Sequence, residues 1–250
     1  MKKICILIMA LILFPQVLIA GEIEEVRLEP VMPGYAVFAA IAEDTNVYKE
    51  HRRVSKVLGQ FSVGATVEIL KDYSLKWYLV ECAEQGVKGW VERKVLAIPP
   101  DEPAEKWELT TFQLEQYMNS NEISSNTAFL IYTDLWRQRT YIFTGSKGSW
   151  RLLRTFVCST GKNESPTTRG TFKTSESGTW FYSKRLGSGG KFWVRFNETY
   201  LFHSVAMNSA KQVIDPTLGE RSSSGCVRHS VEDAEWIYKN IPVDTTVVIN

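Results

Sequence analysis

The segment SSSGCVRHS, residues 222–230, brings together side chains that could carry out nucleophilic chemistry. Cys226 follows a glycine, and Arg228 and His229 lie two and three residues beyond it. A thiol is a strong nucleophile only as the thiolate, and an ordinary pKa of about 8.5 leaves little thiolate at neutral pH. A base that accepts the thiol proton, or a cation beside it, would make Cys226 a candidate nucleophile.

Three histidines could supply that base. His51 lies beside two arginines and is expected in a solvated loop. His229 is close to Cys226 in sequence, but the following Ser230 is expected to begin a helix. His203 ends the apolar segment TYLFHS, and a strand of a rigid sheet is a suitable place for a base. From periodicity alone, His203 could equally be a hydrogen-bonded histidine of the core.

Residues 1–20 have the layout of a secretory signal peptide, with two lysines, an apolar run and a small residue, Ala20, at the expected cleavage point. The alternative is an uncleaved membrane anchor. Pro15 and Gln16 disfavour it, because they interrupt a run that is already shorter than the roughly 20 residues of a spanning helix. The sequence therefore predicts secretion across the cytoplasmic membrane, to the cell wall or a periplasm.

Cleavage would remove Cys5 and leave Cys82, Cys158 and Cys226. Disulfides use cysteines in even numbers, so at least one of these three is expected to be a free thiol. One alternative pairs Cys158 with Cys226 and buries Cys82. The other leaves Cys226 unpaired and reactive.

The composition does not favour a nucleic-acid partner. Removal of residues 1–20 would take away two of the 29 basic residues and none of the 28 acidic ones, which leaves a chain near neutrality. The sequence contains no spacing typical of zinc ligands, and no metal or cofactor is expected. A monomer is expected, with enough apolar sequence for one core or two small ones.

Short strands separated by glycine turns are predicted over residues 35–98, among them TVEILKD, WYLVEC and GWVERKVL. A glycine before the first of these, a tryptophan opening the second and a closing GW-V hairpin resemble bacterial SH3-like domains. This resemblance covers residues 45–96 and implies a small barrel that docks on cell wall or a neighbouring protein. Trp77 and Trp90 could serve such docking or pack within the barrel, and for Trp90 packing is expected.

Residues 99–126 are predicted to form a linker, stiffened by prolines and containing a short helix in TTFQLEQYMN. Residues 127–206 then read as a series of strands. In KFWVRFN, alternation predicts Phe192, Val194 and Phe196 on one face. The segment SVEDAEWIYKNI predicts a short helix capped by Ser230, and TTVVIN predicts a final strand. The cysteine motif is thus expected in a loop between strands and a helix.

Three segments together resemble the L,D-transpeptidases, the cysteine enzymes that cross-link peptidoglycan. They are CSTGKNESPTTRGTF at 158–172, FHS at 202–204 and SSGCVR at 223–228. The resemblance extends over residues 127–250 and implies a mainly β protein, in which an SH3-like barrel precedes an L,D-transpeptidase-type β-sandwich with one short C-terminal helix.

By this resemblance, Cys226 is the nucleophile and His203 the base that activates it. Ser204 occupies the position that helps to orient the histidine. Gly225 permits close approach of the backbone to substrate, and Arg228 shapes the charge of the site. Ser224 departs from the family's pattern, because many members have a histidine directly before the Gly-Cys pair. This difference puts the detailed contacts with substrate in doubt more than the mechanism.

The implied reaction joins peptidoglycan stem peptides. Cys226 would attack the carbonyl of a diamino acid, release the terminal D-alanine and pass the acyl group to a second stem as a 3→3 cross-link. Transfer to water would make the same site an L,D-carboxypeptidase. Two alternatives remain, a sortase-like protein transpeptidase and a non-catalytic wall-binding protein. The position of Arg228 fits a sortase poorly, and the pair of His203 and Cys226 disfavours an inert protein.

Overall fold

The computed structural model describes residue 32 and residues 34–250. The predicted signal peptide therefore lies outside the described residues. Among the helices that the model describes, none is long and apolar enough to cross a membrane.

Residues 37–97 form one antiparallel sheet with a core of its own. Its seven strands are arranged in the order β3-β2-β6-β5-β4-β1-β7. Val47, Val67, Tyr78, Val80 and Val91 are fully buried between the curled faces of this sheet. The strands are β1 (Val37–Ile41), β2 (Thr45–Tyr48), β3 (Val57–Phe61), β4 (Thr66–Tyr73), β5 (Trp77–Cys82), β6 (Val87–Glu92) and β7 (Leu96–Ala97), and a short 3-10 helix, η2 (Arg93–Val95), precedes the last.

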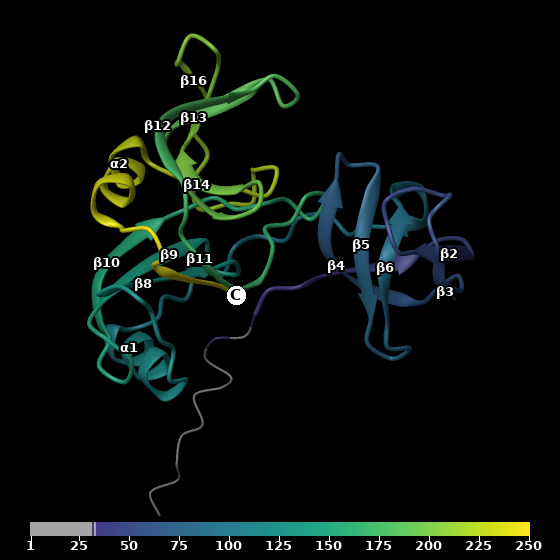
Figure 1. The fold of residues 1–250 in the computed structure, drawn as a ribbon, viewed down its shortest axis with the longest axis horizontal. Coiled ribbons are helices and arrows are strands. Elements are labelled where there is room, and N and C mark those ends of the chain that lie inside the picture. The colour runs from purple at the N-terminus through teal and green to yellow at the C-terminus, as the bar shows by residue number, and fades with distance from the viewer. Residues whose placement is uncertain (1–31, 33) are drawn as a thin grey trace, which may run out of the picture.

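The larger part of the molecule consists of two sheets and two α-helices, and it stands beside the first sheet (Figure 1). The five-stranded sheet has the order β10-β9-β8-β18-β11. Its strands are β8 (Phe129–Asp134), β9 (Arg139–Thr144), β10 (Arg151–Val157), β11 (Gly170–Lys173) and β18 (Thr246–Ile249). The predicted last strand thus lies inside this sheet, parallel to β8.

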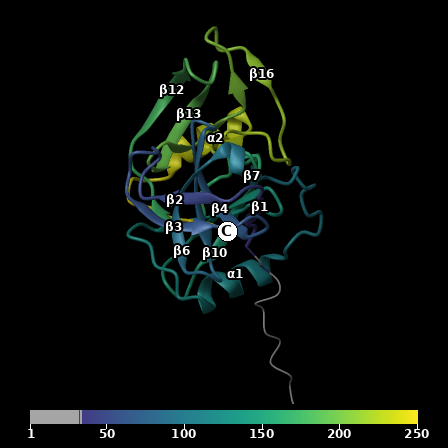
Figure 2. The ribbon, with the colours of Figure 1, turned by 90° about the vertical axis from the view of Figure 1, so that its right-hand side faces the viewer.

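The second sheet has six strands and carries the cysteine motif. Its order is β16-β15-β13-β14-β17, and β12 pairs with β13. Its strands are β12 (Ser177–Ser183), β13 (Ser188–Asn197), β14 (Tyr200–Ser204), β15 (Ala206–Met207), β16 (Val213–Asp215) and β17 (Val227–His229). The β12–β13 hairpin and β16 extend to the top of the molecule in both views (Figures 1 and 2).

The core of this part joins both sheets to helix α2 (Val231–Asn240). Ile131 and Ile142 from one sheet pack with Phe202 and Val227 from the other, and Ile237 closes the cluster from α2. The helix begins where the sequence predicted, because the side chain of Ser230 accepts a hydrogen bond from the N–H of Asp233.

Helix α1 (Thr111–Ser120) confirms the short helix predicted before the strands. It begins with a capping box between Thr110 and Gln113, which satisfies two backbone donors at the helix start. Leu114 and Met118 are buried against the outer face of the five-stranded sheet, where they meet Leu130. This sheet is therefore covered on both faces, which explains why β8 is buried along almost its whole length.

The strand prediction for KFWVRFN is wrong at one residue. Val194 and Phe196 are buried as expected, but Phe192 has a φ of +54° and packs on the ring of Tyr238. A positive φ interrupts the alternation of a strand and costs energy in a non-glycine residue. Two residues further on, at Val194, the pairing of β13 passes from β12 to β14.

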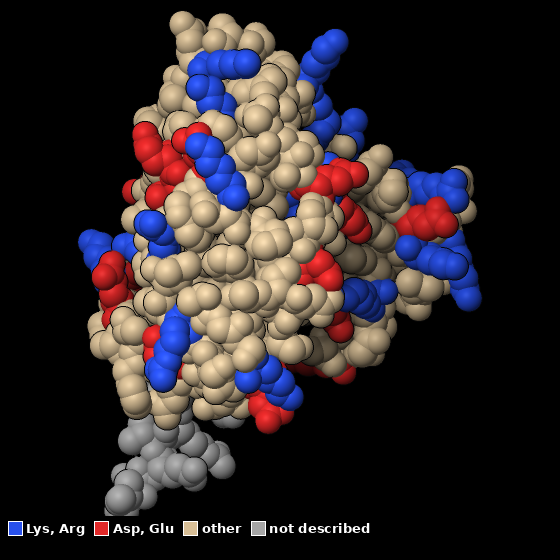
Figure 3. All heavy atoms as spheres, turned by 60° about the vertical axis from the view of Figure 1, so that its left-hand side comes forward, with Lys and Arg blue, Asp and Glu red and all other residues tan. Residues whose placement is uncertain are grey.

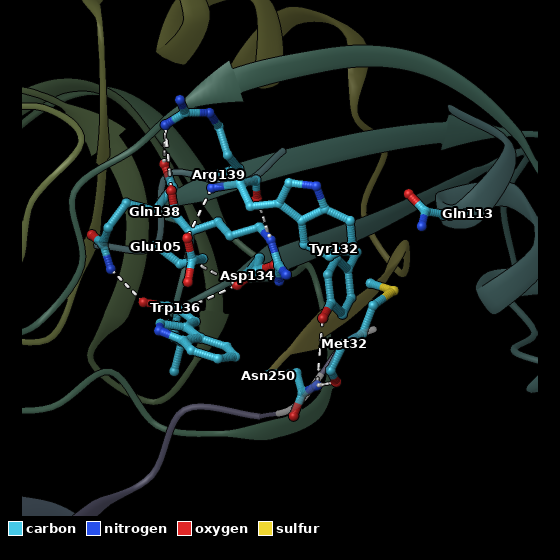
Figure 4. A network of polar contacts seen from close by, with 12 residues as sticks. Met32, Glu105, Gln113, Tyr132, Asp134, Trp136, Gln138, Arg139 and Asn250 are labelled. Atoms are coloured by element: carbon cyan, nitrogen blue, oxygen red, sulfur yellow. Dashed lines mark hydrogen bonds and ion pairs between the residues drawn. The ribbon is translucent and has the colours of Figure 1, made fainter. Parts of the chain in front are cut away.

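The segment between the two parts is fixed against the larger one through a buried ion pair. Arg137 Nη1 lies 2.9 Å from Asp134 Oδ2, and both side chains are buried. Arg137 Nε donates to the carbonyl of Trp107, and the N–H of Glu105 donates to the carbonyl of Trp136 (Figure 4). Removing one partner of such a buried pair is strongly destabilising. The linker is thus an ordered segment that packs against the larger part of the molecule.

Charged side chains of both signs are interspersed over the surface drawn in Figure 3. Many of them form exposed ion pairs such as Arg151–Glu115 and Lys239–Glu235. Pairs of this kind contribute little to stability because water and salt screen them.

Candidate active site

The pairing of β14 with β17 brings His203 and Arg228 to one face of the six-stranded sheet, with Cys226 at the start of β17. The two strands are parallel, with Phe202 opposite Val227 and His203 opposite Arg228. Side chains alternate along each strand and paired residues share a face, so His203 and Arg228 point to the same side. Cys226 lies in the bend directly before β17, where its Sγ is 3.8 Å from the carbonyl oxygen of Thr199, the residue before β14.

A tight turn presents Cys226 at the start of β17. Gly225 has a φ of +105°, and a Cβ atom at this position would lie 2.8 Å from the Tyr200 ring. Both the backbone conformation and the close contact require glycine. The hydroxyl of Ser223 donates to the carbonyl of Cys226 over 2.6 Å and accepts the N–H of Gly225 over 3.1 Å. The turn is therefore rigid before any substrate binds.

The loop after β10 supports the cysteine turn from outside the sheet. Thr167 Oγ1 donates to the carbonyl of Gly225 over 2.7 Å and accepts the N–H of Gly161 over 2.9 Å. The N–H of Lys162 donates to the carbonyl of Ser223 over 3.1 Å. Ser223 and Thr167 were not among the predicted site residues. Both lie in segments that carry the family resemblance, but nothing in the spacing of these segments indicates that they meet in the fold.

The Cys226 thiol is partly exposed, and Sγ lies 3.8 Å from the carbonyl oxygen of Thr199. The surrounding atoms desolvate the sulfur and raise its pKa, although a backbone hydrogen bond from Leu201 and the charge of Arg228 oppose this effect. Near neutral pH the resting group is therefore a thiol, which needs a base before it can attack.

His203 is a buried and neutral imidazole. Its ring packs against Phe181 at a centroid distance of 4.9 Å, and a Cβ atom on Gly190 would lie 2.4 Å from Nδ1. Burial, and then the charge of Arg228, lower the pKa of His203 to about 3, while the backbone of Ser204 opposes the shift. Nδ1 has no hydrogen-bond partner among the described residues. A neutral imidazole with an unused nitrogen can accept a proton.

Asp215 holds Arg228 beside this face. Asp215 Oδ2 lies 2.6 Å from Arg228 Nη1, and the arginine side chain is largely buried. The pKa of Asp215 is lowered, because hydrogen bonds from Thr217 and the charge of Arg228 outweigh its desolvation. Sequence reasoning identified Arg228 but not Asp215, which lies in β16 outside any recognisable motif.

Comparison with known proteins agrees with this arrangement. Residues 128–249 match the YkuD family model, described as L,D-transpeptidase catalytic domain. These residues form an L,D-transpeptidase catalytic domain. The chain is similar to the putative L,D-transpeptidase YciB of Bacillus subtilis (strain 168), with 36% identity over 119 residues. That match covers 45% of this chain and 61% of the relative, so the chain spans about three fifths of the relative's length.

Two solved structures illustrate the range of similarity. One is a fused Zn-dependent amidase, peptidase and peptidoglycan-binding domain-containing protein from Clostridium acetobutylicum ATCC 824, with 35% identity, a TM-score of 0.49 and coverage of 56% of this chain and 59% of that one. The other is an L,D-transpeptidase from Mycobacterium smegmatis, with 17% identity, a TM-score of 0.40 and coverage of 70% and 66%.

The two predicted serines of the transpeptidase domain occupy different environments. The Ser204 hydroxyl donates to the carbonyl of Val205 and accepts the N–H of Lys191, so it connects backbone segments. Its backbone, rather than its hydroxyl, lies against His203. Ser224 is exposed beside the cysteine turn and lines a groove described below.

The other buried histidine and cysteine of the domain belong to its core. His229 points to the opposite face of β17 from Arg228, where Nε2 lies 3.0 Å from the hydroxyl of Thr140. Cys82, Cys158 and Cys226 are all free, which contradicts the alternative of a Cys158–Cys226 disulfide. Cys158 is fully buried, and its burial raises the pKa of its thiol to about 12.

Replacing Cys158 with serine is expected to leave turnover within about threefold of the parent enzyme. A buried thiol that does not ionise can neither attack substrate nor form a disulfide with Cys226. Stability should fall by about 1 kcal/mol, since a hydroxyl is harder to bury than a thiol. Steady-state kinetics and thermal unfolding measure the two effects. A loss of activity in a folded variant would contradict the core assignment of Cys158.

Stability is expected to fall as the pH drops from 7 to 5. Burial lowers the pKa of both His203 and His229 to about 3, whereas both would titrate near 6.5 in the unfolded chain. Between these values the unfolded chain binds protons that the folded protein does not, so the free energy of unfolding decreases by up to about 1.4 kcal/mol per pH unit for each group.

Urea unfolding at several pH values between 5 and 7 measures this slope. The variant His229→Gln should lose about half of it, because one of the two buried imidazoles is then absent. A stability that does not change over this range would contradict the neutral state of both histidines.

Proposed function

We propose that this protein is a secreted L,D-transpeptidase that acts on the stem peptides of peptidoglycan, with Cys226 as nucleophile and His203 as general base. The observation that supports this most directly is the register of β14 and β17, which sets His203 opposite Arg228, two residues after Cys226, in a domain matched to this enzyme family. The resting groups are a protonated thiol and a neutral imidazole, so each has the protonation state that the first step requires.

In the first half of the reaction, the Cys226 sulfur attacks the carbonyl carbon of the third stem residue, a diamino acid, while His203 accepts the thiol proton. Backbone N–H groups at the Cys226 turn stabilise the negative charge on the carbonyl oxygen. The C–N bond to the terminal D-alanine then breaks, His203 returns its proton to the leaving amine, and a thioester remains on Cys226.

In the second half, the side-chain amine of another stem attacks the thioester carbon. His203 removes a proton from this amine, and the thiol of Cys226 is regenerated as the amide forms. The product is a 3→3 cross-link. When water attacks in place of the amine, the product is a tripeptide, and the enzyme acts as an L,D-carboxypeptidase.

Arg228 has a supporting role in this proposal. Burial is the main reason that the pKa of His203 is lowered, and the charge of Arg228 adds to that effect, while the ion pair with Asp215 holds this charge in position. The β sheet of residues 37–97, interpreted as an SH3-like domain, would hold the enzyme on the cell wall.

Mass spectrometry of disaccharide-tetrapeptides after incubation with the purified protein tests the function. Dimers that lack one D-alanine establish 3→3 transpeptidation, and tripeptide monomers alone establish carboxypeptidase activity. Unchanged substrate, with the protein folded, would overturn the proposal and favour a wall-binding protein.

A further inference from the structure

A groove of about 510 Å3 lies between the first sheet and the transpeptidase domain. Strand β4, the turn that follows it and strand β6 form one wall, and the β12–β13 hairpin and the start of β14 form the other. The residues that carry the argument are His51, Tyr73, Trp90, Thr199, Tyr200 and Ser224. A larger cavity of about 660 Å3 shares only Lys71 and Glu198 with this groove and touches neither Ser224 nor Tyr200.

Three aromatic rings cluster on the wall formed by the first sheet. The rings of His51 and Tyr73 have centroids 3.8 Å apart and planes tilted by 30°, and Trp90 meets His51 edge-on at 5.3 Å. Tyr73 is 48% exposed, while His51 and Trp90 are half-buried. His51 lies in a loop as predicted, but its ring is half-buried against the other two, and Trp90 packs on this cluster outside the buried core of its sheet. The cluster is a preformed apolar surface open to the groove.

The opposite wall of the groove leads directly to the candidate nucleophile. The carbonyl oxygen of Thr199 lies 3.8 Å from Cys226 Sγ, and the ring of Tyr200 packs beneath Gly225. Ser224 is exposed one residue before that glycine. A molecule in the groove would therefore touch the cysteine turn on one side and the aromatic cluster on the other.

The two walls are held at a fixed separation. The hydroxyl of Tyr78 donates to the carbonyl of Glu164 over 2.7 Å, and the carboxylate of Glu164 forms an ion pair with Arg93 over 2.5 Å. Ser165 Oγ donates to Asp72 Oδ1 over 2.5 Å. These contacts join the first sheet to the loop that supports the cysteine turn, so the groove does not have to be assembled when a ligand binds.

Most charges within the groove are already compensated by the protein. Lys71 is paired with Glu198 across the junction, and Asp72 accepts hydrogen bonds from Ser165 and from the N–H of Leu75. Arg185, at the tip of the β12–β13 hairpin, is the exception, since it forms no ion pair with any described residue. The surface that remains consists mainly of aromatic faces and hydroxyls, which suits an uncharged polar ligand with an apolar face.

We propose that this groove is a saccharide subsite that binds a pyranose ring of the glycan strand to which the stem peptide is attached. A pyranose has a face of C–H groups that can pack on Tyr73 and Trp90, and hydroxyls that can bond to Ser224 and Thr199. This inference rests on the proposed function, because it takes the peptide bound at Cys226 to be one that is linked to a sugar.

Kinetics with two substrates test the subsite, namely the free tetrapeptide and the same tetrapeptide on its disaccharide. The parent enzyme should have a lower KM for the disaccharide-linked substrate. Tyr73→Ala should raise that KM by about three- to tenfold, the effect of losing one aromatic contact, with kcat and all constants for the free peptide unchanged. Phe38→Ala is the matched control, because Phe38 is a 54% exposed aromatic residue of the same sheet outside the groove.

Trp90→Ala should act in the same direction as Tyr73→Ala, and thermal unfolding shows whether each variant is folded. Equal KM values for the two substrates, or a disaccharide preference that persists in folded Tyr73→Ala, would overturn the subsite. Calorimetric titration of Cys226→Ser with both compounds tests binding without turnover. If neither compound is turned over but the titration still shows a preference that depends on Tyr73, the proposed function fails and the subsite stands.

Discussion

Replacement of Cys226 by serine is expected to abolish turnover while leaving the fold intact. Serine is nearly the same size as cysteine and can accept the same position at the start of β17, where the turn is held by Ser223 and Thr167 rather than by the thiol. A hydroxyl is far harder to ionise than a thiol, so His203 cannot activate it to the same extent. Loss of a nucleophile costs about 10⁴-fold or more in kcat in comparable enzymes.

Two measurements accompany this prediction. Thermal unfolding should show that Cys226→Ser remains within about 1 kcal/mol of the parent protein, as expected for a conservative change in a partly exposed side chain. Alkylation under native conditions should label the parent protein at Cys226 and spare Cys82 and Cys158, which are buried. A Cys226→Ser protein that still releases D-alanine would show that another group is the nucleophile.

The sequence predicts secondary structure well where local signals are strong. Apolar segments bounded by glycine turns became β8 to β14, and Ser230 capped helix α2 as its position indicated. Phe192 escaped this reasoning because its backbone has a positive φ, and such a conformation leaves no mark in the alternation of apolar residues.

The supports of the site were much harder to find from sequence. Thr167, Asp215 and Ser223 act through hydrogen bonds to residues distant in the chain or through the backbone of a turn. Such contacts depend on tertiary pairing, and no local spacing specifies them. The aromatic cluster of the first sheet was missed for the same reason, since His51 and Trp90 meet only when β6 pairs with β2 and β5.

The family resemblance supplied what periodicity could not. Alternation alone left His203 open as an ordinary core histidine, and its low exposure is consistent with that interpretation. What distinguishes it from His229 is the face of the sheet on which it lies. His203 is on the side of Arg228, whereas His229 contacts Thr140 in the core.

Because only His203 lies on the side of Arg228, two residues after Cys226, its replacement is expected to have the second large effect on activity. His203→Ala is expected to lower kcat/KM by about 10²- to 10⁴-fold, the usual contribution of a general base. The residual activity should rise with pH, about tenfold per unit below the thiol pKa, because the variant can attack only through the small fraction of Cys226 that ionises on its own. The parent enzyme should lack this steep rise, since its base accepts the proton during attack.

The matched control is His229→Gln, which alters a histidine that is nearer to Cys226 in sequence but lies on the other face of β17. Glutamine can still bond to Thr140, so this variant should keep activity within a fewfold of the parent at temperatures where it is folded. If His229→Gln were as inactive as His203→Ala, or if His203→Ala lost activity without a changed pH profile, then His203 would act through packing and not as the base. The two variants therefore test whether the catalytic histidine is determined by the face of the sheet on which it lies or by its distance from Cys226 along the chain.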